Sequence, residues 1–179
     1  DRDFNSGLDE FKRKAEALGT GAGKVKSALS PVTKTITALG AAAIAAVPAT
    51  EELRSDLSKL DNNARNAGVG VDAAREAFRA FVVVSDETDS AVEAVANLLQ
   101  GDFTESNLQK AVENLAGAYL SFPDTIKIES LADSLQETLA TGKATGQFGE
   151  LLDRLGIGAQ NFSAGLANCT TEAQKQDYA

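Results

Sequence analysis

Apolar residues recur at alternating steps of four and three positions on both sides of Pro48, a spacing that favours helices packing along one face. Proline cannot continue a helix, so we expect two helical arms joined at Pro48. The first arm, which we call the seam, carries Val25, Leu29, Val32, Ile36, Leu39, Ala43 and Ala46, and the second carries Leu53, Leu57, Leu60, Ala64 and Ala67.

The seam and the second arm predict contact with another helix, either from a second copy of the chain or from a surrounding assembly. The seam is rich in alanine and poor in leucine, so it allows close approach of a partner helix while burying little apolar surface. The candidate interface residues are Val32, Ile36, Leu39, Ala43, Ala46, Leu53, Leu57 and Leu60.

Capping signals mark where the two arms begin. Ser30 followed by Pro31 is typical of an N-cap and a first helical position. Glu51 and Glu52 place negative charge at the start of the second arm. The chain then divides into a leader helix and glycine hinge at residues 1–23, the seam helix, proline joint and second long helix at 24–70, and a helical core of short amphipathic helices at 71–179.

The third part alternates apolar helical stripes with glycine stops at Gly101, Gly142 and Gly156. Asp72 is expected to cap its first helix, and Thr104 is expected to start another. Residues 81–84 have strand propensity, but no second strand signal lies nearby, so we assign them to a helix end. The predicted fold is all-α, with elongated helices, stacked helical hairpins and no sheet. Residues expected to pack between the hairpins are Leu131, Leu135, Leu139, Phe148, Leu151, Leu152 and Leu155.

Alanine supplies much of the apolar character of the chain. The hydrophobic fraction is 43%, but 31 of these residues are alanine and none is tryptophan. Large side chains that could anchor a deep core are therefore few. We expect thin helix-on-helix packing and a stability that depends on assembly.

The sequence lacks the residue patterns that catalysis or metal binding usually needs. It contains no histidine and one cysteine, Cys169, which excludes an internal disulfide. The glycines of residues 19–23 precede Lys24 without the spacing of a phosphate loop, and the four acids of residues 86–93 lack the alternating oxygens of a calcium loop. We therefore expect no enzyme, no catalytic or metal residue, and no cofactor.

The net charge is −9, with seven basic and five acidic residues before residue 35 and ten basic and 21 acidic residues from there on. The acidic part should repel nucleic acid, so no nucleic acid binding is expected.

The longest uncharged stretch, residues 35–50, would be about 24 Å long as a helix, short of the bilayer's hydrocarbon core of about 30 Å. Because the sequence starts at Asp1 and has no methionine, we expect it to be a piece of a longer polypeptide.

An ordered set of segments resembles the tail tape measure proteins of phages and prophages. The Ala-rich helix leads into PATEELRSDLSKLDNNARNAGVG at residues 48–70, and residues 90–100, 108–119 and 128–157 resemble the helical core of that family. The resemblance covers residues 25–179. Residues 101–103 depart from it, because Gly-Asp-Phe is more acidic than the turn typical of that place.

The resemblance implies a virion structural protein that fills the lumen of the tail tube, sets tail length during tail assembly, and leaves ahead of the DNA during genome ejection. It also implies synthesis in the bacterial host cytoplasm and a homo-oligomer, either a trimer or a hexamer. The implied partners are the tail tube protein, the tail tip or baseplate proteins and a tail assembly chaperone. Elongated helices and negative charge are compatible with this function.

Two other functions stay open on the sequence. Residues 35–50 would insert in the host membrane if several copies associate, forming a channel for genome delivery, because small residues permit close helix packing in lipid. Alternatively, residues 90–179 would act as a helical adaptor that binds a tail tip protein or an assembly chaperone.

Overall fold

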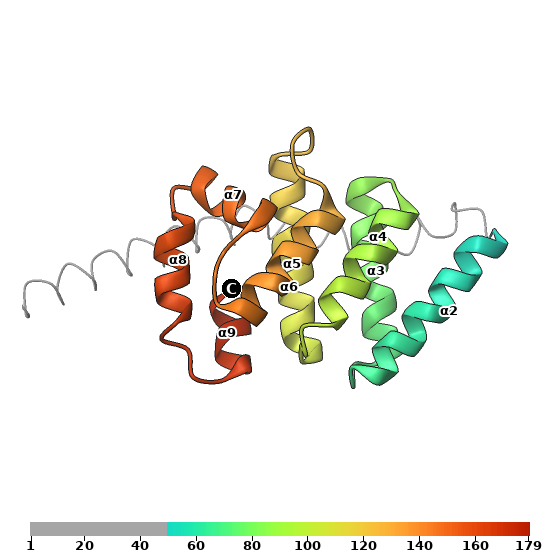
Figure 1. Cartoon of the computed structure of the whole chain (residues 1–179). Coiled ribbons are helices and arrows are strands. Elements are labelled where there is room, and N and C mark those ends of the chain that lie inside the picture. The colour runs from blue at the N-terminus through green and yellow to red at the C-terminus, as the bar shows by residue number, and fades with distance from the viewer. Residues whose placement is uncertain (1–49) are drawn as a thin grey trace, which may run out of the picture. The chain divides into compact units, whose positions relative to one another are not determined.

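A computed structural model describes residues 50–179, which form eight α-helices and contain no strand (Figure 1). The chain divides into two units, residues 1–35 and 36–179, and all described residues lie in the second. The predicted all-α fold is confirmed for this part of the chain. The helices are α2 (Glu51–Asn66), α3 (Val71–Ser85), α4 (Thr88–Leu99), α5 (Glu105–Ser121), α6 (Ile128–Thr141), α7 (Gly146–Arg154), α8 (Ala159–Leu166) and α9 (Glu172–Tyr178).

Threonine side chains cap three of these helices. The hydroxyl oxygens of Thr50, Thr104 and Thr171 each accept the backbone N–H three residues later, at 3.1 to 3.3 Å. Each cap pairs an N–H group that has no partner within its helix. The starts predicted at Glu51 and Thr104 are therefore confirmed, with Thr50 as the residue that caps α2.

Left-handed residues follow several helix ends. Gly142 and Gly156 take φ values of 74° and 73° after α6 and α7, as the glycine stops predicted. Gly101 also follows the end of α4 by two residues, as predicted, but the left-handed residue of this turn is Asp102, with φ of 52°.

The valine-rich run at residues 81–84 belongs to α3, as predicted, and the Phe81 side chain is fully buried. The prediction that Asp72 caps this helix is wrong. Gly70 occupies the N-cap position, and its N–H donates to the Glu105 carboxylate at 2.7 Å. The Glu105 carboxylate of α5 therefore accepts the N–H at the start of α3. Asp72 lies in the first turn of α3 and does not cap it.

Two helical hairpins stack on each other at the centre of the described residues. Helix α3 lies against α5 and α4 lies against α6, so the α3–α4 hairpin faces the α5–α6 hairpin. Helix α2 contacts α3 and α4, while α7 packs on α6 and α8 packs on α7 (Figure 1). Helix α9 contacts α5 and α6. The predicted stacked hairpins are thus present, and the seam helix predicted before Pro48 lies outside the described residues.

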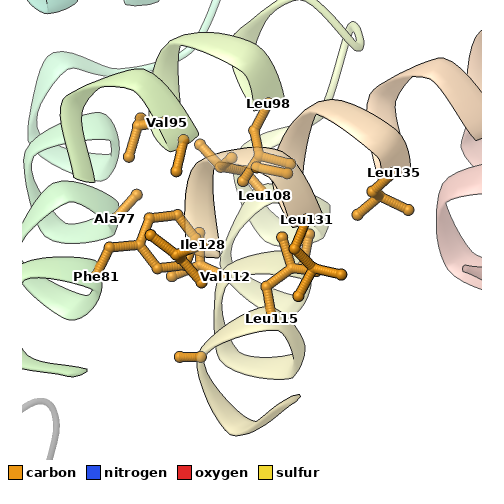
Figure 2. Close-up of a cluster of buried hydrophobic side chains, with 14 of the residues drawn as sticks. Ala77, Phe81, Val95, Leu98, Leu108, Val112, Leu115, Ile128, Leu131 and Leu135 are labelled. Carbon is orange, nitrogen blue, oxygen red and sulfur yellow. The ribbon is translucent and has the colours of Figure 1, made fainter. Parts of the chain in front are cut away.

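In the part of the core that lies between the two hairpins, large aliphatic side chains pack around Phe81. Figure 2 shows Phe81 of α3 close to Val112 and Ile128, with Leu115 and Leu131 beside them. All five side chains are at most 4% exposed. Burying a side chain of this size contributes about 1.5 to 3 kcal/mol to folding.

Alanines let the helices approach one another closely. Ala74, Ala91, Ala94, Ala116 and Ala132 are fully buried at helix contacts. A methyl group fills little space, so the helix backbones come together without voids. The alanine-rich composition thus produces helix-on-helix packing, and this packing encloses a continuous core.

The boundary expected at residue 70 does not separate two parts of the structure. Leu60 and Ala64 of α2 and Val69 of the following turn belong to the same buried cluster as α3 to α8. The apolar face of α2 is covered by α3 and α4 of the same chain. The boundaries expected nearer the N-terminus lie outside the described residues.

Candidate functional site

The interface residues predicted from the sequence fall into two groups. Leu60 is 1% exposed and packs inside the chain, which corrects the expectation that it contacts a helix of a second copy or of a surrounding assembly. Leu53 and Leu57 are partly buried against the same core. The remaining candidates lie outside the described residues, and for them the interface stays a prediction: Val32, Ile36, Leu39, Ala43 and Ala46.

Six of the seven residues predicted to pack between the hairpins are buried: Leu131, Leu135, Leu139, Phe148, Leu151 and Leu152. Leu155 is the exception and is 51% exposed. Helix α7 ends at Arg154, and the chain turns at Gly156, so that Ile157 packs against the core in place of Leu155.

An ion pair that the sequence pattern did not reveal joins α2 to α3. The Arg75 guanidinium donates two parallel hydrogen bonds to the Asp61 carboxylate, at 2.6 and 2.7 Å. These hydrogen bonds hold the pKa of Asp61 below its ordinary value and raise the pKa of Arg75. Fourteen residues separate the two partners, so no helical spacing rule connects them.

Ser134 links α6 to the start of α7. Its hydroxyl oxygen accepts the Phe148 N–H at 2.9 Å, and the hydroxyl donates to the Ser130 carbonyl at 2.8 Å. The side chain is 4% exposed, so the backbone N–H that it pairs is buried with it. This contact is structural, because both polar partners belong to the protein backbone.

Gln176 joins α9 to the turn between α4 and α5. Its side chain is 8% exposed, and its amide nitrogen donates to the carbonyl oxygens of Gly101 and Asp102, each at 3.0 Å. Its amide oxygen accepts a hydrogen bond from the Asn107 side chain at 3.2 Å. The glutamine thus uses both ends of its amide. A lone glutamine in a polar segment carries no sequence signal for such a contact.

Two further contacts hold α9 in place. Lys110 on α5 pairs with Asp177 at 2.8 Å, and the Tyr178 ring lies 5.0 Å from the Phe162 ring. The Tyr178 hydroxyl occupies the space that a Cβ atom at Gly165 would need. Partial burial raises the pKa of the Tyr178 phenol.

Two leucine side chains lie exposed near helix ends, Leu120 at 45% and Leu155 at 51%. The Arg154 guanidinium connects these two regions, because it lies 5.7 Å from the centre of the Phe122 ring and donates to the Thr125 hydroxyl at 2.7 Å. The ends of α5 and α7 therefore lie close together. Apolar side chains exposed at such a place are available for contact with another protein.

Among residues 50–179, no group of three His, Cys, Asp or Glu side chains could hold a metal ion. In the same range, no helix combines the length and hydropathy that a membrane crossing requires. Cys169 is a free, partly buried thiol. Comparisons with models of known protein families, with curated proteins and with solved structures give no match for this chain.

Proposed function

We propose that the chain is a structural protein of a phage or phage-like tail, in which residues 50–179 form a folded helical unit that binds other tail proteins. The observation that carries this proposal is the stacking of the α3–α4 hairpin on the α5–α6 hairpin around one core. Stacked hairpins are typical of scaffold and adaptor proteins, because the outer faces of successive helices form an extended surface. The assignment to a tail rests on the resemblance of residues 25–179 to tape measure proteins.

In this proposal the described residues attach the chain and do not measure length. A ruler acts through extended length, and residues 90–157 would reach about 100 Å as one straight helix. They instead fold back into helices that share a core. The setting of tail length would therefore belong to other parts of a longer polypeptide.

The proposed partners are the tail tube protein, the tail tip or baseplate proteins and the tail assembly chaperone. Leu120 and Leu155 supply exposed apolar contacts for such a partner. From residue 35 onward acidic residues outnumber basic ones, 21 to ten, a balance that favours a protein partner over DNA.

Co-purification tests the proposal. The tagged full chain is co-expressed with the tube, tip and chaperone proteins in turn, together with a Leu120→Ser, Leu155→Ser double variant. We expect at least one protein to be retained by the parent chain and lost with the double variant. A Lys143→Ser chain, altered at an exposed position on the α6–α7 turn, should retain it. If the parent chain retains none of the three proteins, the proposal fails.

Deletion separates attachment from length setting. Removing residues 128–157 takes out α6 and α7 and exposes the core, so we expect tails to be lost in electron micrographs. If the deletion variant instead forms normal tails that are only shorter, residues 128–157 belong to the part of the protein that sets tail length. The membrane channel would be favoured instead if liposome binding by the full chain depends on residues 31–50.

A further inference from the structure

Helix α9 is held by the side-chain contacts of Gln176, Asp177 and Tyr178 described above. It has seven residues, and a helix this short is not stable alone in water, so its helical form depends on the surface that receives it. Gln176 is its one buried residue. Asp177 and its partner Lys110 are each 59% exposed, and exposed ion pairs contribute little. Separating α9 from the molecule breaks the three Gln176 hydrogen bonds and the Tyr178–Phe162 contact, but it leaves the apolar core between the two hairpins in place.

The segment before α9 can change its path without disrupting the core. Residues 167–171 connect α8 to α9, and their side chains are exposed or partly buried. Three backbone hydrogen bonds, from Ala167, Asn168 and Cys169, tie this connection to the end of α8, and the Asn168 side chain adds a fourth. Five extended residues reach about 17 Å, enough for α9 to leave its own molecule and contact a neighbour placed against α8.

The surface under α9, which we call the α9 site, selects for the sequence of α9. It consists of the carbonyl oxygens of Gly101 and Asp102, the side chains of Asn107, Lys110 and Phe162, and the open backbone at Gly165. The two carbonyl oxygens and Asn107 fit an amide side chain, because an amide offers two N–H donors together with an acceptor oxygen, whereas a hydroxyl has a single donor. Because Gly165 has no side chain, the site also has room for an aromatic ring two residues after that amide, which in α9 is the ring of Tyr178. Of the two tyrosines in the chain, only Tyr178 follows a glutamine by two positions.

We propose that the α9 site of one molecule holds α9 of a second copy of this chain, so that two copies exchange this helix. Every contact of the closed molecule is then made between molecules, and no new interface needs to evolve. Exchange is governed by concentration, because a short flexible tether presents α9 to its own site at about 1 mM. We expect α9 to occupy its own site in dilute solution, and exchange to approach half of the molecules when the chain reaches about 1 mM. This inference does not depend on the tail function.

Cross-linking between differently tagged full-length chains tests the exchange. All chains carry Cys169→Ser, one carries Lys110→Cys with a size tag, and the other carries Asp177→Cys. The mixture is treated with a short bismaleimide over a range of concentrations. We expect a cross-linked heterodimer whose yield rises with concentration to several times the yield of a control pair. The control replaces Lys110→Cys by Lys143→Cys, an exposed position on the α6–α7 turn that reports random collision.

Two additional chains make the result decisive. A single chain with both Lys110→Cys and Asp177→Cys should cross-link to itself, because the two side chains meet in the closed molecule. Adding Gly165→Ala to the Lys110→Cys chain should reduce the heterodimer to the control yield, because the new methyl group occupies the place of the Tyr178 hydroxyl. The proposal is overturned if the heterodimer never exceeds the control yield, or if the double-cysteine chain does not cross-link to itself.

Discussion

Asp61 and Arg75 show how paired polar side chains specify the contact between two helices. The apolar faces of α2 and α3 fit several relative positions, whereas a guanidinium that donates two parallel hydrogen bonds to one carboxylate fits few. Ser134 acts in the same way between α6 and α7, since its hydroxyl reaches one backbone N–H. At the scale of single residues, these polar contacts select one arrangement among the packings that the apolar residues allow.

The Asp61 carboxylate should make stability depend on pH. We expect Asp61→Asn to lower the free energy of unfolding by about 1 kcal/mol at pH 7. Because the pKa of Asp61 is lower in the folded chain than its ordinary value of 3.8, the carboxylate stabilises the fold above that value, and this contribution is lost as the pH falls through the folded pKa. Urea unfolding from pH 7 to pH 3 measures the difference between the parent and the variant.

The difference should be constant at neutral pH and shrink below about pH 4. Asp56→Asn is the matched control, because within residues 50–179 Asp56 pairs with Lys59 on its own helix, three residues away. We expect that variant to change stability by less than about 0.5 kcal/mol. A difference for Asp61→Asn that grows toward low pH would contradict the assigned role of the ion pair.

Ser134→Ala should destabilise the chain by about 1 to 3 kcal/mol, because it leaves the buried Phe148 N–H without a partner. Thermal unfolding measures this effect. Ser130→Ala is the control, since Ser130 contributes its backbone carbonyl to the contact and keeps it in the variant. Equal melting temperatures for the two variants would show that the hydroxyl contact is unimportant.

At the scale of helices, the position where a helix ends decides which of its apolar residues are buried. Leu151 and Leu155 lie one turn apart, yet the first is 5% exposed and the second is 51% exposed. Helix α7 ends between them, and Ile157 packs against the core after the turn at Gly156. Glycine stops therefore act on packing as well as on helix length.

A pair of leucine variants tests this account. Leu131→Ala removes a fully buried side chain from α6 and should lower the free energy of unfolding by about 2 to 5 kcal/mol. Leu155→Ala removes an exposed side chain and should change it by less than about 0.5 kcal/mol. Denaturant unfolding of the two full-length variants measures both values. A cost for Leu155→Ala comparable with that of Leu131→Ala would mean that Leu155 is covered in solution.

At the scale of the whole described region, one core connects α2 to the helices that follow it. Leu60 belongs to the same buried cluster as Leu135, although a boundary was expected between them at residue 70. Residues that share a core usually unfold together. The stability of α2 is therefore coupled to that of the two hairpins.

We expect Leu60→Ala and Leu135→Ala to shift one common unfolding transition to lower temperature. Each deletes a buried side chain, at a cost of about 2 to 5 kcal/mol. Calorimetry of the full-length variants measures the shift, and far-ultraviolet circular dichroism follows the loss of helix. If α2 unfolds in a separate transition at lower temperature, and Leu60→Ala affects that transition while the main one is unchanged, then a boundary at residue 70 exists.

The sequence by itself determined the helices of residues 50–179. Helical periodicity, the acidic residues Glu51 and Glu52, Thr104 and the glycine stops act within a few residues, so the starts of α2 and α5 and the ends of α6 and α7 could be predicted. The same local information identified six of the seven residues that pack between the hairpins.

Only the tertiary structure decided which helices meet and which polar groups pair across them. Asp61 with Arg75, Glu105 with Gly70 and Gln176 with the α4–α5 turn are contacts between residues 14 to 75 positions apart. The same is true of Leu60, whose burial depends on α3 and α4 coming back to cover it. Periodicity shows that a helix face is apolar, but the identity of its partner depends on how the whole chain folds, because many apolar faces are equally able to cover one another.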